Sequence, residues 1–192
     1  DVTPTGYSTT VLAANGEETA TLVGQGANRQ YVTIDEIPLD LQHAFVAIED
    51  ERFYDHNGID LHGIGRAFIS GLSKGRFSEG ASTITQQLIK NNVLTSWTSE
   101  TSFVEKLQRK IQEQYLALEL EKQVNDKDWI LENYMNSVNL GANTLGVQAA
   151  SKKYFNKDVS ELTLSEASVI AGITQNPSGY NPITHPDKNA KR

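Results

Sequence analysis

The stretch AIEDERFYDHNG, residues 47–58, joins an apolar helical run to a cluster of acidic and imidazole side chains with almost no spacer. In the preceding run Leu41, Phe45 and Ile48 recur at helical spacing and predict the buried face of a helix. Glu49 follows directly, so its carboxylate should lie at the edge of this apolar face rather than in open solvent. A partly desolvated carboxylate is a better proton acceptor, which indicates a candidate site.

The alternative for this stretch is an ordinary acidic end of a helix. Glu49, Asp50 and Glu51 would then oppose the helix dipole, at a cost of roughly 0.3–1 kcal/mol per group. That cost favours a site, but most acidic clusters are structural, and this segment alone leaves both readings open.

Composition narrows the classes of function. The chain has 192 residues, a net charge of −7 and no cysteine. The charge argues against nucleic acid as a partner, and the missing thiols exclude disulfides and cysteine-based sites. The four histidines are far apart, which disfavours a metal held by side chains alone. The chain begins with Asp1 rather than Met, so we expect an excised fragment, with anchors or further domains outside it.

The pattern predicts a mainly α domain over residues 35–192 and a small β appendage over residues 1–34. Thr9–Ala13 and Thr19–Val23 flank an Asn-Gly turn and predict a hairpin, which residues 31–34 could extend by a short strand. Capping residues and apolar spacing predict helices that start near Asp60, Ser82, Ser102, Asn125, Leu145 and Thr163. The longest runs from Ser102 to about Lys122 and carries an apolar stripe of Phe103, Leu107, Ile111, Tyr115 and Leu118.

Polar side chains follow one face of the helix predicted after Ser82. Thr83, Gln87 and Lys90 share this face, and Gln86 and Asn91 flank it. A helix N-terminus lined with hydroxyls and closed by a lysine is a natural anion site. A solvated polar face is the alternative.

Arg109, Lys110 and Glu113 form a charged cluster on the long helix. On the surface they would be an ordinary ion-pair cluster, worth a few tenths of a kcal/mol. Facing a cleft, two cations beside a carboxylate would form a diphosphate clamp. The spacing is compatible with both.

These segments, taken in order, resemble the motifs of glycosyltransferase family 51, the peptidoglycan glycosyltransferases. That family includes monofunctional enzymes and the N-terminal catalytic domain of class A penicillin-binding proteins. The motif E-D-x-x-F-x-x-H-x-G stands as Glu49, Asp50, Phe53, His56 and Gly58; G-x-S-T-x-x-Q-Q as Gly80, Ser82, Thr83, Gln86 and Gln87; R-K-x-x-E as Arg109, Lys110 and Glu113. Residues 130–136 and 171–182 are similar to the fourth and fifth motifs.

The resemblance implies a lysozyme-like, two-lobed helical fold that polymerises lipid II into β-1,4 glycan strands. Glu49 would be the general base, and inversion at the donor sugar would release the lipid diphosphate. Arg109, Lys110 and Lys90 would stabilise that diphosphate, and Glu113 would orient them or hold a divalent cation, Mg²⁺ or Mn²⁺. The residues that would bind substrate are Asp50, Phe53, His56, Ser82, Thr83, Gln86, Gln87, Asn91 and Gln175.

The resemblance also implies partners and a location. The substrates would be lipid II and the lipid-linked glycan, at the outer leaflet of the cytoplasmic membrane. A loop over residues 73–82 would touch the lipid, and a segment outside this chain would anchor it on the extracytoplasmic face. A transpeptidase domain would also lie outside. The alternatives are a lysozyme-like hydrolase of the same glycan and an inactive wall- or lipid-binding module.

Overall fold

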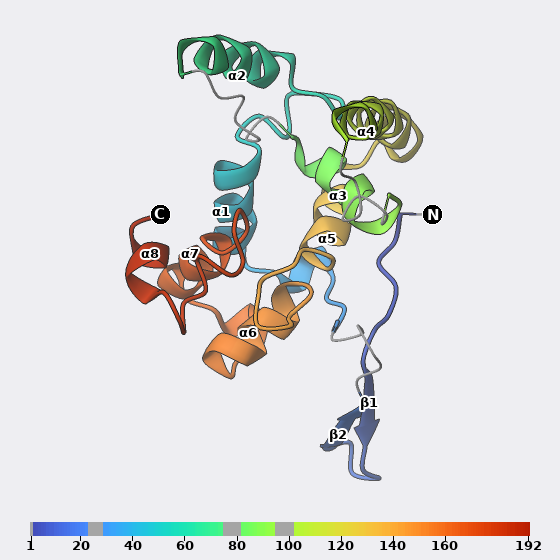
Figure 1. The fold of residues 1–192 in the computed structure, drawn as a ribbon. Helices are drawn as coiled ribbons and strands as arrows, with labels where there is room; N and C mark the ends of the chain where they lie inside the picture. The colour runs from blue at the N-terminus through green and yellow to red at the C-terminus, as the bar shows by residue number, and fades with distance from the viewer. Residues whose placement is uncertain (1, 23–28, 75–81, 95–101) are drawn as a thin grey trace. The chain divides into compact units, whose positions relative to one another are not determined.

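The computed structural model describes residues 2–22, 29–74, 82–94 and 102–192 (Figure 1). These residues are mainly helical with one small antiparallel sheet, which confirms the predicted fold class. They divide into two compact units. The first comprises residues 45–134 with the extreme N-terminus, and the second comprises residues 3–44 and 135–192. Gly80 and most of the predicted lipid-contacting loop lie outside the described residues.

The predicted hairpin is confirmed. Strand β1 (Thr9–Leu12) pairs antiparallel with β2 (Glu18–Leu22) around the Asn-Gly turn, where Gly16 has a φ of +85° (Figure 1). The strand suggested for residues 31–34 does not form. The backbone N–H and C=O of Val32 pair with the side-chain amide of Asn136 instead of a strand, and residues 34–36 form the 3-10 helix η1 (Ile34–Glu36).

The first unit contains the end of α1 (Leu39–Glu49), then α2 (Leu61–Lys74), α3 (Ile84–Asn92), α4 (Phe103–Val124) and most of α5 (Lys127–Met135). Leu41 and Phe45 of α1 are fully buried, as the apolar spacing predicted, whereas Ile48, predicted on the same face, is only partly buried. Helix α3 begins at Ile84 rather than Ser82, because Thr83 is its N-cap. Helix α5 ends at Met135, and the side chain of the next residue, Asn136, pairs with the backbone of Val32.

The second unit contains α6 (Val147–Phe155), η3 (Val159–Glu161), α7 (Leu164–Ala171) and α8 (Pro186–Ala190). Helix α6 packs against η3 and α7. Thr163 and Glu166 form the predicted capping box of α7. The short helix α8, which begins with Pro186, was not predicted.

Helix α4 exposes its apolar side chains and buries charged ones, the opposite of an ordinary amphipathic helix that packs on a core. Its apolar stripe faces outward, and Phe103 at 79% is the most exposed member. The stripe residues are Phe103, Val104, Leu107, Ile111, Tyr115 and Leu118. The buried face instead carries Glu113, Ala117 and Glu121, and α4 packs against α3. Two buried carboxylates on a packed face need partners, and these partners define the site.

Candidate active site

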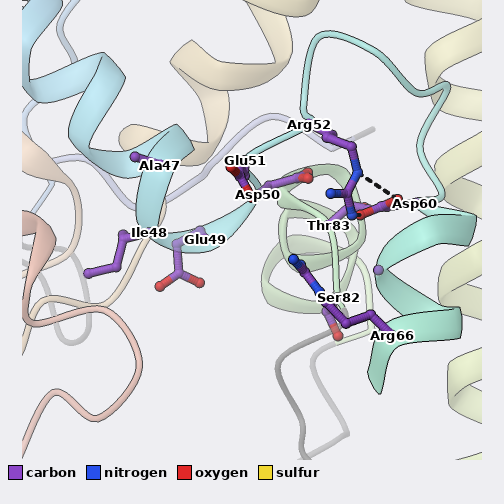
Figure 2. A pocket seen from close by; sticks show the side chains of 11 residues that line it. Ala47, Ile48, Glu49, Asp50, Glu51, Arg52, Asp60, Arg66, Ser82 and Thr83 are labelled. Carbon is purple, nitrogen blue, oxygen red and sulfur yellow. Dashed lines mark hydrogen bonds and ion pairs between the residues drawn. The ribbon is translucent and has the colours of Figure 1, made fainter. Parts of the chain in front are cut away.

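Helix α1 ends by presenting two adjacent carboxylates in different directions (Figure 2). Glu49, its last residue, is half-buried and accepts a hydrogen bond from Nε2 of Gln87 at 2.9 Å. The hydroxyl of Tyr134 in turn donates to Oε1 of Gln87 at 3.1 Å. Glu49, the candidate proton acceptor, is thus held by Gln87 of α3, which is itself hydrogen-bonded by Tyr134 of α5.

Asp50 serves the start of α3. Its carboxylate is buried and accepts the backbone N–H of Ile84 at 3.0 Å, and both of its oxygens lie 3.0 Å from Nε2 of His56. A carboxylate is favourable at a helix N-terminus. The N-terminus of α3, interpreted from sequence as an anion site, therefore already holds an anion from within the protein.

The turn after α1 is fixed by backbone contacts around Gly58. The N–H of Gly58 donates to Nδ1 of His56, and its carbonyl accepts from the Thr83 hydroxyl at 2.7 Å and from Nε2 of Gln86 at 3.4 Å. Gly58 has a φ of +89°, and a Cβ there would lie 2.7 Å from the carbonyl oxygen of Ala117. Only glycine meets both conditions.

An ion pair between the partly buried Lys127 and the buried Glu121, which the sequence analysis did not predict, supports the same turn. Lys127 Nζ contacts both carboxylate oxygens of Glu121, at 2.8 and 2.7 Å, and donates to the carbonyl oxygen of His56 at 2.6 Å. The same ammonium lies 4.5 Å from the ring centroid of the fully buried Phe53, and the hydroxyl of Thr85 donates to Glu121. These residues belong to α3, α4, α5 and the turn, and their sequence spacing gives no signal of the pairing.

The charged cluster of α4 packs inward. Glu113 is fully buried; Arg109 contacts one of its oxygens, and Lys110 Nζ lies 2.6 Å from the other. Lys110 also donates to the hydroxyl of Ser82 at 2.8 Å, just before α3. An exposed surface cluster, the alternative left open by the spacing, does not describe Glu113 and Arg109, whereas the Lys110 side chain is 41% exposed.

Glu49 and Ser82 line one pocket of the first unit (Figure 2). Lys110 of α4 is not among the residues that line the pocket, but its ammonium donates to the hydroxyl of Ser82 in the pocket wall. The pocket is lined by Ala47, Ile48, Glu49, Asp50, Glu51, Arg52, Asp60, Gly63, Arg66, Ser82 and Thr83. Its wall carries four carboxylates and two guanidinium groups, a polar lining that can hydrogen-bond the hydroxyls of a sugar.

Arg52, Asp60 and Arg66 are pocket residues that the motifs did not include. Arg52 and Asp60 form an ion pair, drawn as a dashed line in Figure 2. Burial alone would raise the pKa of Asp60, but the Arg52 guanidinium and the N–H of Gly63 together hold it below its ordinary value. A separation of eight residues across a turn is no recognisable pairing pattern, although Asp60 was predicted as a helix cap.

The remaining predicted residues are placed as follows. Lys90 lies one turn beyond Gln87 on α3, on the face that meets Glu49, and Asn91 follows it. Gln175 belongs to the second unit, where its side-chain oxygen accepts a hydrogen bond from Arg192. Roles in substrate binding stay predictions for all three.

The described residues do not fit a metal held by the protein alone. They contain no group of three or more histidines or carboxylates that could hold an ion. Both oxygens of Glu113 are occupied by Arg109 and Lys110. Its environment fits a carboxylate that orients two cations, one of the two roles expected for it.

Comparisons with known proteins identify the family of the chain. Residues 15–192 match the family described as Transglycosylase. The chain is 45% identical over 185 residues to "Penicillin-binding protein 1F" of Bacillus subtilis, covering 96% of this chain and 24% of that protein. It is 42% identical over 189 residues to "Penicillin-binding protein 1A/1B" of the same organism, covering 98% and 20%.

A third relative, "Penicillin-binding protein 1A" of Clostridium botulinum, is 48% identical over 167 residues, covering 84% of this chain and 19% of that protein. The chain thus spans about a fifth to a quarter of the length of these relatives. The predicted family and enzyme class are confirmed: the chain belongs to the transglycosylase family, glycosyltransferase family 51, and is a peptidoglycan glycosyltransferase domain.

Proposed function

We propose that this domain polymerises lipid II into β-1,4 glycan strands, with Glu49 as the general base. The observation that carries the proposal is the link between the pocket that Glu49 lines and the cation cluster of α4. Glu49 lines it from the end of α1, and Ser82 in its wall binds Lys110 of the cation cluster. A proton acceptor and a site for a charged leaving group are the two components that this transfer needs.

In the proposed step, Glu49 takes the proton from the 4-hydroxyl of the acceptor N-acetylglucosamine. The oxygen attacks the anomeric carbon of the donor N-acetylmuramic acid as the bond to the lipid diphosphate breaks. The diphosphate leaves with the electron pair, and the α linkage becomes β. Because a diphosphate is a weak base, the leaving group needs stabilisation of charge more than protonation.

Arg109 and Lys110 would supply that stabilisation, with Lys90 as a third cation. The buried carboxylate of Glu113 keeps the first two in place, since each contacts one of its oxygens. A divalent cation, Mg²⁺ or Mn²⁺, would be held mainly by the diphosphate itself, because Glu113 already has two cationic partners.

We divide the other motif residues by their surroundings. Asp50, Phe53, His56, Thr83 and Gln86 are largely buried and contact other parts of the protein, so they would chiefly maintain the shape of the pocket. Those assigned to direct substrate contact are Ser82, Gln87, Lys90, Asn91, Arg109, Lys110 and Gln175.

The outward stripe of α4 supports contact with a lipid surface. An amphipathic helix with exposed aromatic and aliphatic side chains can lie in the interface of a bilayer. No helix among the described residues is long and apolar enough to cross a membrane. We propose the outer leaflet of the bacterial cytoplasmic membrane as the partner, with an anchor outside this chain.

The domain assignment follows the same proposal. Residues 35–192 would form the catalytic domain, and residues 1–34 an appendage that carries the β1–β2 hairpin. The curated relatives are four to five times longer than the matched region, which supports a transpeptidase domain elsewhere in the parent protein.

The test is a polymerisation assay with lipid II, with and without Mg²⁺, on the wild type and Glu49→Gln. We expect glycan polymer from the wild type and at least about a 10²-fold slower reaction from the variant, because a positioned base contributes about that much. Binding of lipid II should remain, since the amide keeps the shape of the carboxylate.

Parallel incubation with polymeric peptidoglycan separates the other functions. Soluble muropeptides would indicate a hydrolase, and binding without turnover an inactive module. Unchanged turnover in Glu49→Gln would remove Glu49 from the mechanism.

A further inference from the structure

We propose that Tyr134 is a positioning residue that orients the base Glu49 through Gln87. The inference rests on the proposed function, since it assigns a role relative to that base. Its observation is a chain of two hydrogen bonds, from the Tyr134 hydroxyl to Oε1 of Gln87 and from Nε2 of Gln87 to Oε2 of Glu49. None of the catalytic roles expected for the motif residues includes Tyr134.

The chain has only one workable direction. An ionised carboxylate has no hydrogen to donate, so Gln87 must turn its NH₂ group toward Glu49. The amide oxygen then faces the opposite way and needs a donor, which the Tyr134 hydroxyl supplies at 3.1 Å. Without that donor the amide oxygen would lose its partner, and the Gln87 side chain could leave the orientation in which its NH₂ group holds the carboxylate.

Packing makes Tyr134 a rigid support. Its ring is fully buried and lies edge-on to Phe45, with ring centroids 6.1 Å apart. Phe45 lies one helical turn before Glu49 on α1. Tyr134 therefore contacts the helix that carries the base and also fixes the amide that binds the base.

An ordinary structural tyrosine would also be buried with a satisfied hydroxyl. The difference is the partner: the hydroxyl binds a half-buried amide whose other end holds the proposed base, rather than a backbone carbonyl. Tyr154 provides the comparison, because its partly buried hydroxyl donates to the carbonyl oxygen of Leu140 at 2.7 Å in the second unit.

The test compares Tyr134→Phe with Tyr154→Phe in lipid II polymerisation. Each change removes one hydroxyl and keeps the ring. We expect Tyr134→Phe to lower kcat by roughly three- to tenfold, the worth of one hydrogen bond, with KM unchanged to within about twofold. Tyr154→Phe should leave kcat unchanged. A spectroscopic readout accompanies the kinetics: Tyr134→Phe should shift the side-chain amide ¹H–¹⁵N signals of Gln87, and Tyr154→Phe should not.

A double-mutant cycle tests the route through the amide. In a Gln87→Ala background, Tyr134→Phe should cause no further loss, because the chain is already broken. Three outcomes would each overturn the inference while leaving the proposed function intact. The first is a further loss of kcat when Tyr134→Phe is added to Gln87→Ala. The others are an unchanged Gln87 amide signal and an unchanged kcat in Tyr134→Phe. A wild type that makes no polymer would overturn the proposed function, and this inference with it.

Discussion

Two features restrict position 58 to glycine, a positive φ and a close approach of another backbone segment. Gly16 shares only the first feature and therefore separates their effects. Both Gly58 and Gly16 have φ near +85°, but a Cβ at Gly16 meets nothing within 4 Å, whereas one at Gly58 would lie 2.7 Å from the Ala117 carbonyl oxygen. We expect Gly16→Ala to lower the free energy of unfolding by about 1 kcal/mol, for backbone strain alone. Gly58→Ala should cost more than about 3 kcal/mol, since backbone atoms must move.

Urea unfolding of the two variants measures the difference. Gly58→Ala should also impair polymerisation even where it folds, because the Gly58 carbonyl accepts bonds from Thr83 and Gln86 beside the pocket. Equal stability losses in the two variants would show that the approach of α4 to the turn imposes no constraint.

At the scale of single elements, helix α4 exposes its apolar stripe and buries charged side chains. The exposed stripe leads to a prediction about membrane binding. The double variant Phe103→Ser with Ile111→Ser should reduce binding to vesicles of phosphatidylglycerol and phosphatidylethanolamine by at least about tenfold. Each large apolar side chain transferred from water contributes about 1.5–3 kcal/mol. Because both residues are exposed, the melting temperature should hardly change.

Leu164→Ser on α7 is the matched control, since Leu164 is 61% exposed and lies outside the stripe. It should bind vesicles like the wild type. Vesicle binding by the stripe variant at the wild-type level would exclude α4 as the lipid-contacting surface.

The same element shows what periodicity can and cannot predict. Spacing and capping residues predicted the existence of α4 and its start at Ser102, because these depend on neighbours within one helix. Which face of α4 is buried depends on partners far along the chain. Ser82 meets Lys110 across 28 residues, and Thr85 meets Glu121 across 36. Similarly, Gln87 and Tyr134 are 47 positions apart in the sequence, and no local pattern reveals their hydrogen bond.

At the scale of the whole molecule, charge is distributed unevenly. The chain carries a net charge of −7, yet Arg109 and Lys110 are held together by a single buried carboxylate, and Lys110 also contacts Ser82 of the pocket wall. A local cationic site in an acidic protein attracts an anionic substrate to one place while the rest of the surface repels it. This arrangement agrees with the diphosphate-linked substrate that we propose.

Both compact units contain carboxylates whose pKa lies below the ordinary value. The free energy of unfolding should therefore change with pH in the acid range. They are Asp60 in the first unit and Glu36, Asp158 and Glu166 in the second. Hydrogen bonding to the Lys157 ammonium, followed by the backbone and hydroxyl of Thr163, lowers the pKa of Glu166 from 4.5 to about 2. The folded state therefore binds this proton less readily than the unfolded chain does.

A depressed pKa stabilises the fold above the unfolded value, and that contribution is lost as the pH falls toward the folded value. The gap in melting temperature between the wild type and Glu166→Gln should thus be constant above about pH 5 and narrow between about pH 4.5 and pH 2. Lys157→Met should remove most of the same pH dependence, because it deletes the first cause of the shift. Lys153→Met, which alters an exposed lysine of α6 four positions before Lys157, should retain it. A gap that persists unchanged to pH 2 would mean that the Lys157–Glu166 pair contributes no pH-dependent stability to this molecule.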